Sequence, residues 1–88
     1  MKIDRIDYTI AIEQVNEPQR NCESNCNEIM FVNKGAATCY VEKYPIVQDD
    51  FLTIGGNIGE YCTKNFNVQA PAGSNLFVFR KYYLNEKK

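Results

Sequence analysis

Short runs of strand-forming residues, separated by turn residues, recur along most of this sequence. The runs EIMFV, ATCYVEKY, FLTI and LFVFRKYYL are divided by segments rich in Asn, Asp, Gly and Pro. Turns this frequent leave no room for long helices and favour short antiparallel strands. Ile, Val, Thr, Phe and Tyr supply 29 residues, whereas Ala, Leu and Met supply only 10. We therefore expect an all-β fold, a small antiparallel β-sandwich of about seven short strands that is jelly-roll-like in pattern.

A chain of 88 residues forms one small domain with little core to spare. Its expected parts are an N-terminal strand (1–12), a polar loop (13–27), a β core (28–84) and a basic tail (85–88). The first strand alternates in its second half and places Ile6, Tyr8, Ile10 and Ile12 on one face. That alternation predicts a half-buried strand.

Several turns are defined by residues with special backbone geometry. We expect the turn-defining residues to be Gly35, Pro45, Gly55, Gly56, Asn57 and Gly59. The segment from Asn33 to Ala36 predicts a hairpin between its flanking strands. The glycine cluster at 55–59 predicts a tight turn with positive φ, because it lacks the Lys-Ser/Thr sequence and the following helix of a phosphate-binding loop.

Catalysis and cofactor binding find little support in the composition. There is no His, so the usual Ser/His/Asp and Cys/His systems cannot be built, and we expect no enzyme activity, no cofactor and no metal. The pair Asp49 and Asp50 is explained by turn preference. No apolar run is long enough to span a bilayer, and from the polar residues 1–5 we expect no signal peptide. A net charge of -1 gives no indication of nucleic acid or membrane partners.

Four cysteines leave a zinc module open as a minor alternative. Only Cys22 and Cys26 are close in sequence, whereas zinc sites usually present two close pairs. We expect Cys39 and Cys62 to be small buried side chains and Cys22 and Cys26 to be loop thiols.

Two strands are apolar on both faces. Residues 29–32 and 76–79 are apolar at every position, and Tyr82, Tyr83 and Leu84 continue the second run. A strand with one solvated face would alternate, so something must cover the outer face, either the 13–27 loop or another chain. The two ends also differ in charge, with net -3 over residues 1–30 and net +4 over residues 61–88. They could pair as neighbouring strands inside one fold, or the basic tail could meet an acidic patch on another chain. The predicted interface residues are Met30, Val32, Phe77, Phe79, Arg80, Lys81 and Tyr83.

Turn and core positions of the predicted β core form a distinct succession: Val32, Asn33, Gly35, Tyr44, Pro45, Ile46, Ile54, Gly56, Asn57, Glu60, Thr63 and Phe66, followed by the strand LFVFRKYY. This succession resembles that of small β-sandwich virion proteins of crAss-like tailed phages. Residues 1–27 fall outside the match, and Gln48-Asp49-Asp50 stands where such proteins usually have a Pro-Gly turn.

The resemblance implies a non-enzymatic protein of the capsid exterior, made in the cytoplasm of a bacterial host. It would be a capsid decoration protein or a head-fibre component that forms a dimer or trimer and docks on the major capsid protein or another head-surface protein. The alternative is a glycan-binding adhesion module on the particle surface, with Tyr40, Tyr61 or Tyr83 as a stacking platform.

Overall fold

The computed structural model describes residues 7–57 and 59–84, which form eight strands and no helix. The strands are β1 (Tyr8–Val15), β2 (Arg20–Glu23), β3 (Glu28–Asn33), β4 (Cys39–Val41), β5 (Tyr44–Ile46), β6 (Phe51–Gly55), β7 (Asn65–Gln69) and β8 (Leu76–Tyr83). The all-β prediction is confirmed. Within the described ranges, no helix has the length and apolar character needed to cross a membrane.

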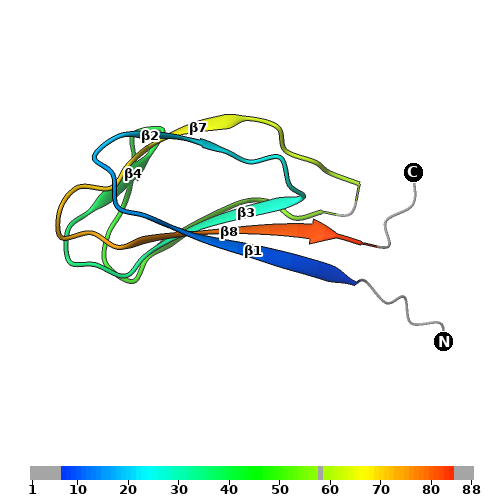
Figure 1. Cartoon of the computed structure of the whole chain (residues 1–88), viewed down its shortest axis with the longest axis horizontal. Helices are drawn as coiled ribbons and strands as arrows, with labels where there is room; N and C mark the ends of the chain where they lie inside the picture. The colour runs from blue at the N-terminus through cyan, green and yellow to red at the C-terminus, as the bar shows by residue number, and fades with distance from the viewer. Residues whose placement is uncertain (1–6, 58, 85–88) are drawn as a thin grey trace.

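The strands form two antiparallel sheets of four that face each other. One sheet has the order β1-β8-β3-β6 and the other β2-β7-β4-β5 (Figure 1). Each strand of the first half pairs with its counterpart in the second half: β1 with β8, β2 with β7, β3 with β6 and β4 with β5. Such nesting is a long antiparallel hairpin wrapped into two layers, which is the jelly-roll topology.

The core lies between the two sheets and is made by alternate residues of the strands. Phe31 of β3 and Phe66 of β7 pack edge to face across the layers, with ring centroids 5.7 Å apart. The other buried apolar residues are Val15, Cys22, Cys26, Ile29, Cys39, Val41, Ile46, Val68, Ala70, Leu76 and Val78. Within the described ranges, every buried side-chain nitrogen and oxygen has a hydrogen-bond partner.

The segment 13–27, expected to be a loop, contains regular structure. β1 runs on to Val15, and β2 occupies residues 20–23. Burial explains the difference, because Cys22 and Cys26 point into the core although their sequence neighbours are polar. The loop therefore does not cover the doubly apolar strands. Residues 1–6 of the predicted first strand and the predicted tail 85–88 lie outside the described residues.

The predicted hairpin at Asn33–Ala36 is wrong, since β3 and β4 belong to different sheets. The Asn33 side chain is fully buried and organises the crossing. Its amide donates to the carbonyls of Ala37 (2.8 Å) and Ile46 (2.9 Å), and its oxygen accepts from the backbone N–H groups of Gly35 (2.9 Å) and Asn75 (3.2 Å). One polar side chain thus fixes three neighbouring turns.

The hairpin that does form joins β4 to β5 through Glu42 and Lys43. Both residues have positive φ, 50° and 72°, as in the two-residue turns that match strand twist. Pro45, expected to define a turn, instead lies within β5, an edge strand where its missing N–H breaks no ladder.

The glycine positions follow two different physical rules. Gly55, Gly56 and Gly59 have φ values of 83°, 108° and 91°, the conformation that the glycine cluster predicts. Gly35 is needed for space, since a Cβ there would lie 2.5 Å from the backbone oxygen of Gly73.

Candidate assembly surface

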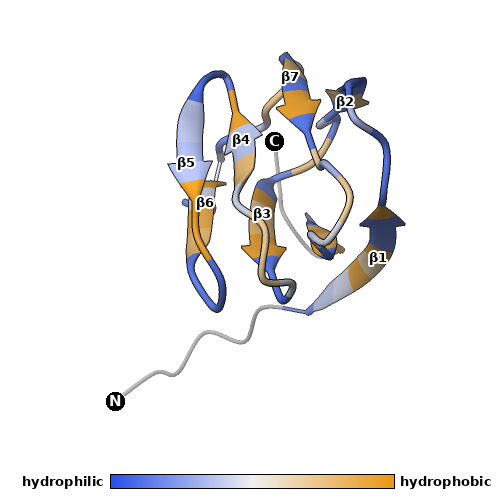
Figure 2. Ribbon diagram, turned by 90° about the vertical axis from the view of Figure 1, so that its left-hand side faces the viewer, coloured by the Kyte–Doolittle hydropathy of each residue, from blue (hydrophilic) through white to orange (hydrophobic). Residues whose placement is uncertain are grey.

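The outer face of the β1-β8-β3-β6 sheet carries an apolar band that crosses all four strands. The strand register places its side chains in two adjacent rows, Ile12, Phe79, Met30 and Thr53 in the first and Gln14, Phe77, Val32 and Phe51 in the second. We call the six apolar members of these rows (Ile12, Met30, Val32, Phe51, Phe77 and Phe79) the apolar band. In Figure 2, β3 and β6 carry orange, hydrophobic segments, and β1 carries a shorter one.

The apolar band is open to solvent at both ends. Ile12 is 62% exposed on β1, and Phe51 is 58% exposed on β6. The four residues between them are half-buried by one another. Isolated exposed apolar residues are ordinary, whereas contiguous exposed apolar patches are typical of interaction surfaces.

One border of the apolar band is polar and close to neutral. Lys81 of β8 forms an ion pair with Glu28 of β3 (Nζ to Oε1, 3.1 Å), and its ammonium lies 5.0 Å from the ring centroid of Tyr8. The hydrogen bond to Glu28 raises the pKa of Lys81, so this lysine stays charged. Tyr83 donates its hydroxyl hydrogen to the carbonyl of Gly56. At this border the two charges therefore pair with each other, and the neighbouring side chains on the outer face are Tyr8 and Tyr83.

The structure brings together six of the seven predicted interface residues. Met30, Val32, Phe77, Phe79, Lys81 and Tyr83 all lie on this outer face. Arg80 does not, because neighbouring residues of a strand point to opposite faces. The doubly apolar runs therefore supply one core face and one outer face, as their pattern indicates.

Arg80 faces the interior and links three strands. Its guanidinium donates to Glu13 Oε1 of β1 (3.0 Å), to the Glu23 carbonyl of β2 (2.8 Å) and to the Cys22 sulfur (3.1 Å). Glu13 also pairs with Arg20. Burial would raise the pKa of Glu13, but the hydrogen bonds from the two arginines outweigh it and lower that pKa. Likewise, burial would lower the pKa of Arg80, and Glu13 raises it.

The sequence did not identify the β1 contribution to the surface. Tyr8, Ile10 and Ile12 were expected to be half-buried against the core, but they are 53%, 44% and 62% exposed on the outer face. Period-two alternation shows which residues share a face and leaves open which face is inside. Charge in the sequence points the wrong way, because a residue such as Glu13 ordinarily lies on the solvent face, whereas here it pairs with Arg80 between the sheets.

Cys39 is buried as the sequence predicts, whereas the other three cysteines differ from the expectation. Cys22 and Cys26 are buried with Cys39, so they are not loop thiols, and Cys62 is half-buried. Burial raises the pKa of Cys22 and Cys39, and burial together with nearby Cys62 raises the pKa of Cys26 to about 11. Buried thiols that stay protonated at neutral pH are poor nucleophiles. The described residues contain no group of three or more His, Cys, Asp or Glu side chains placed to hold a metal ion.

Asp49 and Asp50 act as turn residues. Asp49 pairs with Lys34 (3.2 Å), and the carboxylate of Asp50 accepts from the Phe51 N–H (2.9 Å). Each carboxylate has a local structural partner, as their turn position predicts.

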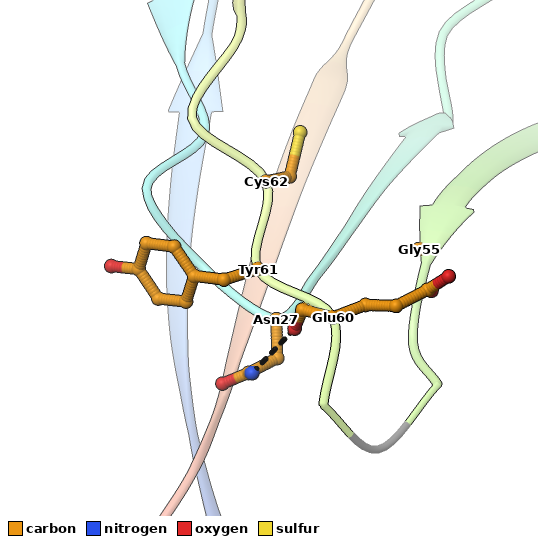
Figure 3. Close-up of a pocket in the computed structure, with 5 residues that line it drawn as sticks. All are labelled: Asn27, Gly55, Glu60, Tyr61 and Cys62. Atoms are coloured by element: carbon orange, nitrogen blue, oxygen red, sulfur yellow. Dashed lines mark hydrogen bonds between the residues drawn. The ribbon is translucent and has the colours of Figure 1, made fainter. Parts of the chain in front are cut away.

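A shallow pocket of about 360 Å³ lies at the end of the sandwich, beside the glycine turn. Its lining comprises Asn27, Gly55, Glu60, Tyr61 and Cys62, with the Asn27 amide bonded to the Glu60 carbonyl at 2.8 Å (Figure 3). The Tyr61 ring points away from Gly55, toward which the Glu60 carboxylate extends. Aromatic and acidic groups thus diverge, unlike the converging groups of a small-molecule site.

The candidate glycan tyrosines are dispersed over the molecule. Tyr40 lies on β4 and Tyr83 on β8, in different sheets, while Tyr61 lies in the loop before β7. Tyr61 is 57% exposed, and its hydroxyl donates to the Asn25 carbonyl at 2.7 Å. The three rings therefore do not form one stacking platform.

Compared with known proteins, the chain matches no protein-family model, no curated sequence and no solved structure. Function is therefore inferred from its residues, its geometry and the motif resemblance described above.

Proposed function

We propose that this protein is a non-enzymatic virion structural protein, a capsid decoration protein or head-fibre component, that self-associates and docks on the major capsid protein. The observation that carries the proposal is the apolar band, a contiguous apolar surface on a chain of 88 residues. A domain of this size buries little apolar surface in its own core and is only marginally stable. Burying the apolar band against other chains would therefore be strongly favourable.

The composition of the surface suits a protein partner. Interface centres are enriched in Phe, Tyr and Met and depleted in unpaired charge. The apolar band contains Phe51, Phe77, Phe79 and Met30, and the charges at one border, Lys81 and Glu28, pair with each other. A nucleic acid would need unpaired basic groups in this position.

The fold and the motif resemblance support the proposal that the protein lies on the capsid exterior. Jelly rolls form viral capsid and lectin domains, so the fold fits a virion protein without specifying one. The resemblance to crAss-like phage proteins lies mainly in turn and core residues such as Asn33 and Gly35, which the structure shows at the crossing between sheets. We place the protein on the capsid exterior, after synthesis in the cytoplasm of the bacterial host.

A glycan-binding adhesion module is the second candidate. It is favoured by one observation, the 57% exposed Tyr61 ring beside the pocket at the end of the sandwich. A sugar stacked there would be lost in a Tyr61→Ala variant, and binding on a glycan array would favour this candidate.

Reconstitution on capsids tests the leading proposal. Purified protein is mixed with empty capsids of the phage that encodes it, and bound copies are located by mass spectrometry and cryo-EM. We expect symmetric occupancy of the outer surface, and loss of occupancy for Phe51→Lys, which places a charge in the apolar band. The matched control is Val47→Lys, which is similarly exposed (53%) outside the band. Capsids that remain bare with wild-type protein would contradict the proposal.

A further inference from the structure

β1 is an edge strand with half of its backbone hydrogen-bonding groups pointing away from the sheet. The Leu84 N–H donates to the Asp7 carbonyl at 2.9 Å, so the backbone of Asp7 faces β8. Backbone direction alternates along an antiparallel strand, so Thr9, Ala11 and Glu13 also bond to β8. The even-numbered residues Tyr8, Ile10, Ile12 and Gln14 therefore direct their N–H and C=O groups outward from the edge.

The other three edges of the described sandwich are short or blunted. β5 has three residues and contains Pro45, β2 has four residues with Arg20 and Glu23 at its ends, and β6 has five and ends at Gly55 with φ 83°. β1 has eight residues, and Tyr8–Ile12 is uncharged and exposed on both faces. Soluble proteins protect edge strands that must stay unpaired by making them short or by placing charges, Pro or bulges in them. β1 lacks such protection over Tyr8–Ile12, which favours its pairing with another strand.

We propose that β1 pairs antiparallel with β1 of a second copy about a twofold axis through Ala11, which joins two four-stranded sheets into one of eight strands. This rests on the proposed self-association and assigns its contact and symmetry. A second copy fits because the strand is self-complementary. Ala11 lies opposite Ala11 of the second copy, Ile10 opposite its Ile12, and Thr9 opposite its Glu13.

The register follows from charge and from the number of bonds. An axis through Ile10 would place Asp7 opposite Glu13 of the second copy, and like charges directly opposite are destabilising. The axis through Ala11 instead places Asp7 opposite Val15 and engages all four outward-facing residues, Tyr8 with Gln14 and Ile10 with Ile12. A twofold axis perpendicular to the sheet keeps both outer faces on one side. The two apolar bands then form one surface for the capsid partner.

Disulfide crosslinking of single-cysteine substitutions in the full chain tests this geometry. At the axis, Ala11 and its counterpart form a non-hydrogen-bonded pair with Cα atoms about 4.5 Å apart, within the span of a disulfide. Ala11→Cys is treated with oxidised glutathione and analysed on non-reducing gels. Thr9→Cys is the matched control, exposed on the same face of β1 but opposite Glu13 of the second copy. The wild type controls for the native cysteines.

We expect a covalent dimer for Ala11→Cys and at least tenfold less for Thr9→Cys and the wild type. Ile10→Pro removes an outward N–H without breaking the β1–β8 ladder, so it should be folded and monomeric. An oligomeric wild type with no Ala11→Cys crosslink and an unchanged Ile10→Pro oligomer would overturn the edge contact while leaving self-association through the apolar band intact. Preferential crosslinking of Thr9→Cys would overturn the register. A monomeric wild type would overturn the proposed self-association as well.

Discussion

Arg80 shows how one residue can look like an interface group in the sequence and prove to be a structural one. It follows four apolar residues in a strand that supplies an outer surface, yet its guanidinium bonds Glu13, Glu23 and Cys22 between the sheets. Its side chain is only 15% exposed. This mostly buried charge is therefore held between the edge strands of the two sheets by a specific set of acceptors.

Arg80→Met should destabilise the protein without changing its assembly. The substitution leaves the Glu23 carbonyl and part of the Glu13 carboxylate without donors, a cost of about 1–3 kcal/mol in the free energy of unfolding. The matched control is Lys81→Met, which removes a partly exposed ion pair at a cost below about 1 kcal/mol. Urea denaturation measures both. A stable Arg80→Met variant with altered oligomeric state would instead place Arg80 in the interface.

Acid should weaken the fold through Glu13. Its pKa in the folded state is lowered from the ordinary value of 4.5, because the hydrogen bonds to Arg80 and Arg20 outweigh burial. The ionised carboxylate thus favours the folded state. Its contribution is complete above the unfolded pKa and disappears as the pH falls through the lower, folded value. Melting temperatures of the wild type should fall on acidification below about pH 4.5.

Glu13→Gln should flatten that acid dependence. A neutral amide cannot gain a proton there, so the variant should be less stable at pH 7 and should approach the wild type at pH 3. Glu17→Gln is the matched control, since the Glu17 side chain is 58% exposed and pairs only at the surface. If the melting temperatures of the wild type and Glu13→Gln changed by the same amount between pH 7 and pH 3, the role given to Glu13 would be refuted.

Among the structural elements, the turns determined which predictions succeeded. The turn at the glycine cluster was predicted correctly because backbone positions with positive φ are usually occupied by glycine. The β4–β5 turn was missed because Glu42 and Lys43, which are not glycine, adopt φ values of 50° and 72°. The crossing after β3 was mistaken for a hairpin because Asn33 acts through long-range bonds, such as the one to Asn75, that local patterns cannot show.

Asn33→Asp should damage the turns that this side chain connects. A carboxylate cannot donate to the carbonyls of Ala37 and Ile46, so the variant would bury a charge against two acceptors. We expect a loss of about 3 kcal/mol or more in unfolding free energy. Asn65→Asp is the control at an exposed strand position. Equal stabilities of the two variants would show that the Asn33 network is dispensable.

For the whole molecule, the sequence predicted a two-layer β fold and an uncovered outer surface. Six of the seven interface candidates share one face because period-two alternation of two all-apolar strands requires it. Which face of β1 is buried could not be predicted, because alternation alone does not specify the inner face. Whether another strand lies on each side of β1 depends on the strand order, which the sequence pattern does not give. That strand order leaves Ile10 and Ile12 on an edge strand, with Ile12 forming one end of the apolar band.

Sedimentation velocity of the wild-type protein and of Ile12→Lys, across micromolar concentrations, tests the central claim most directly. Ile12 is 62% exposed, so a lysine there is tolerated by the fold while it charges both the apolar band and the β1 edge. We predict a discrete oligomer for the wild type and a monomer for Ile12→Lys, with unchanged circular dichroism. A wild-type protein that sediments as a monomer at every concentration would contradict the assignment of this surface to self-assembly.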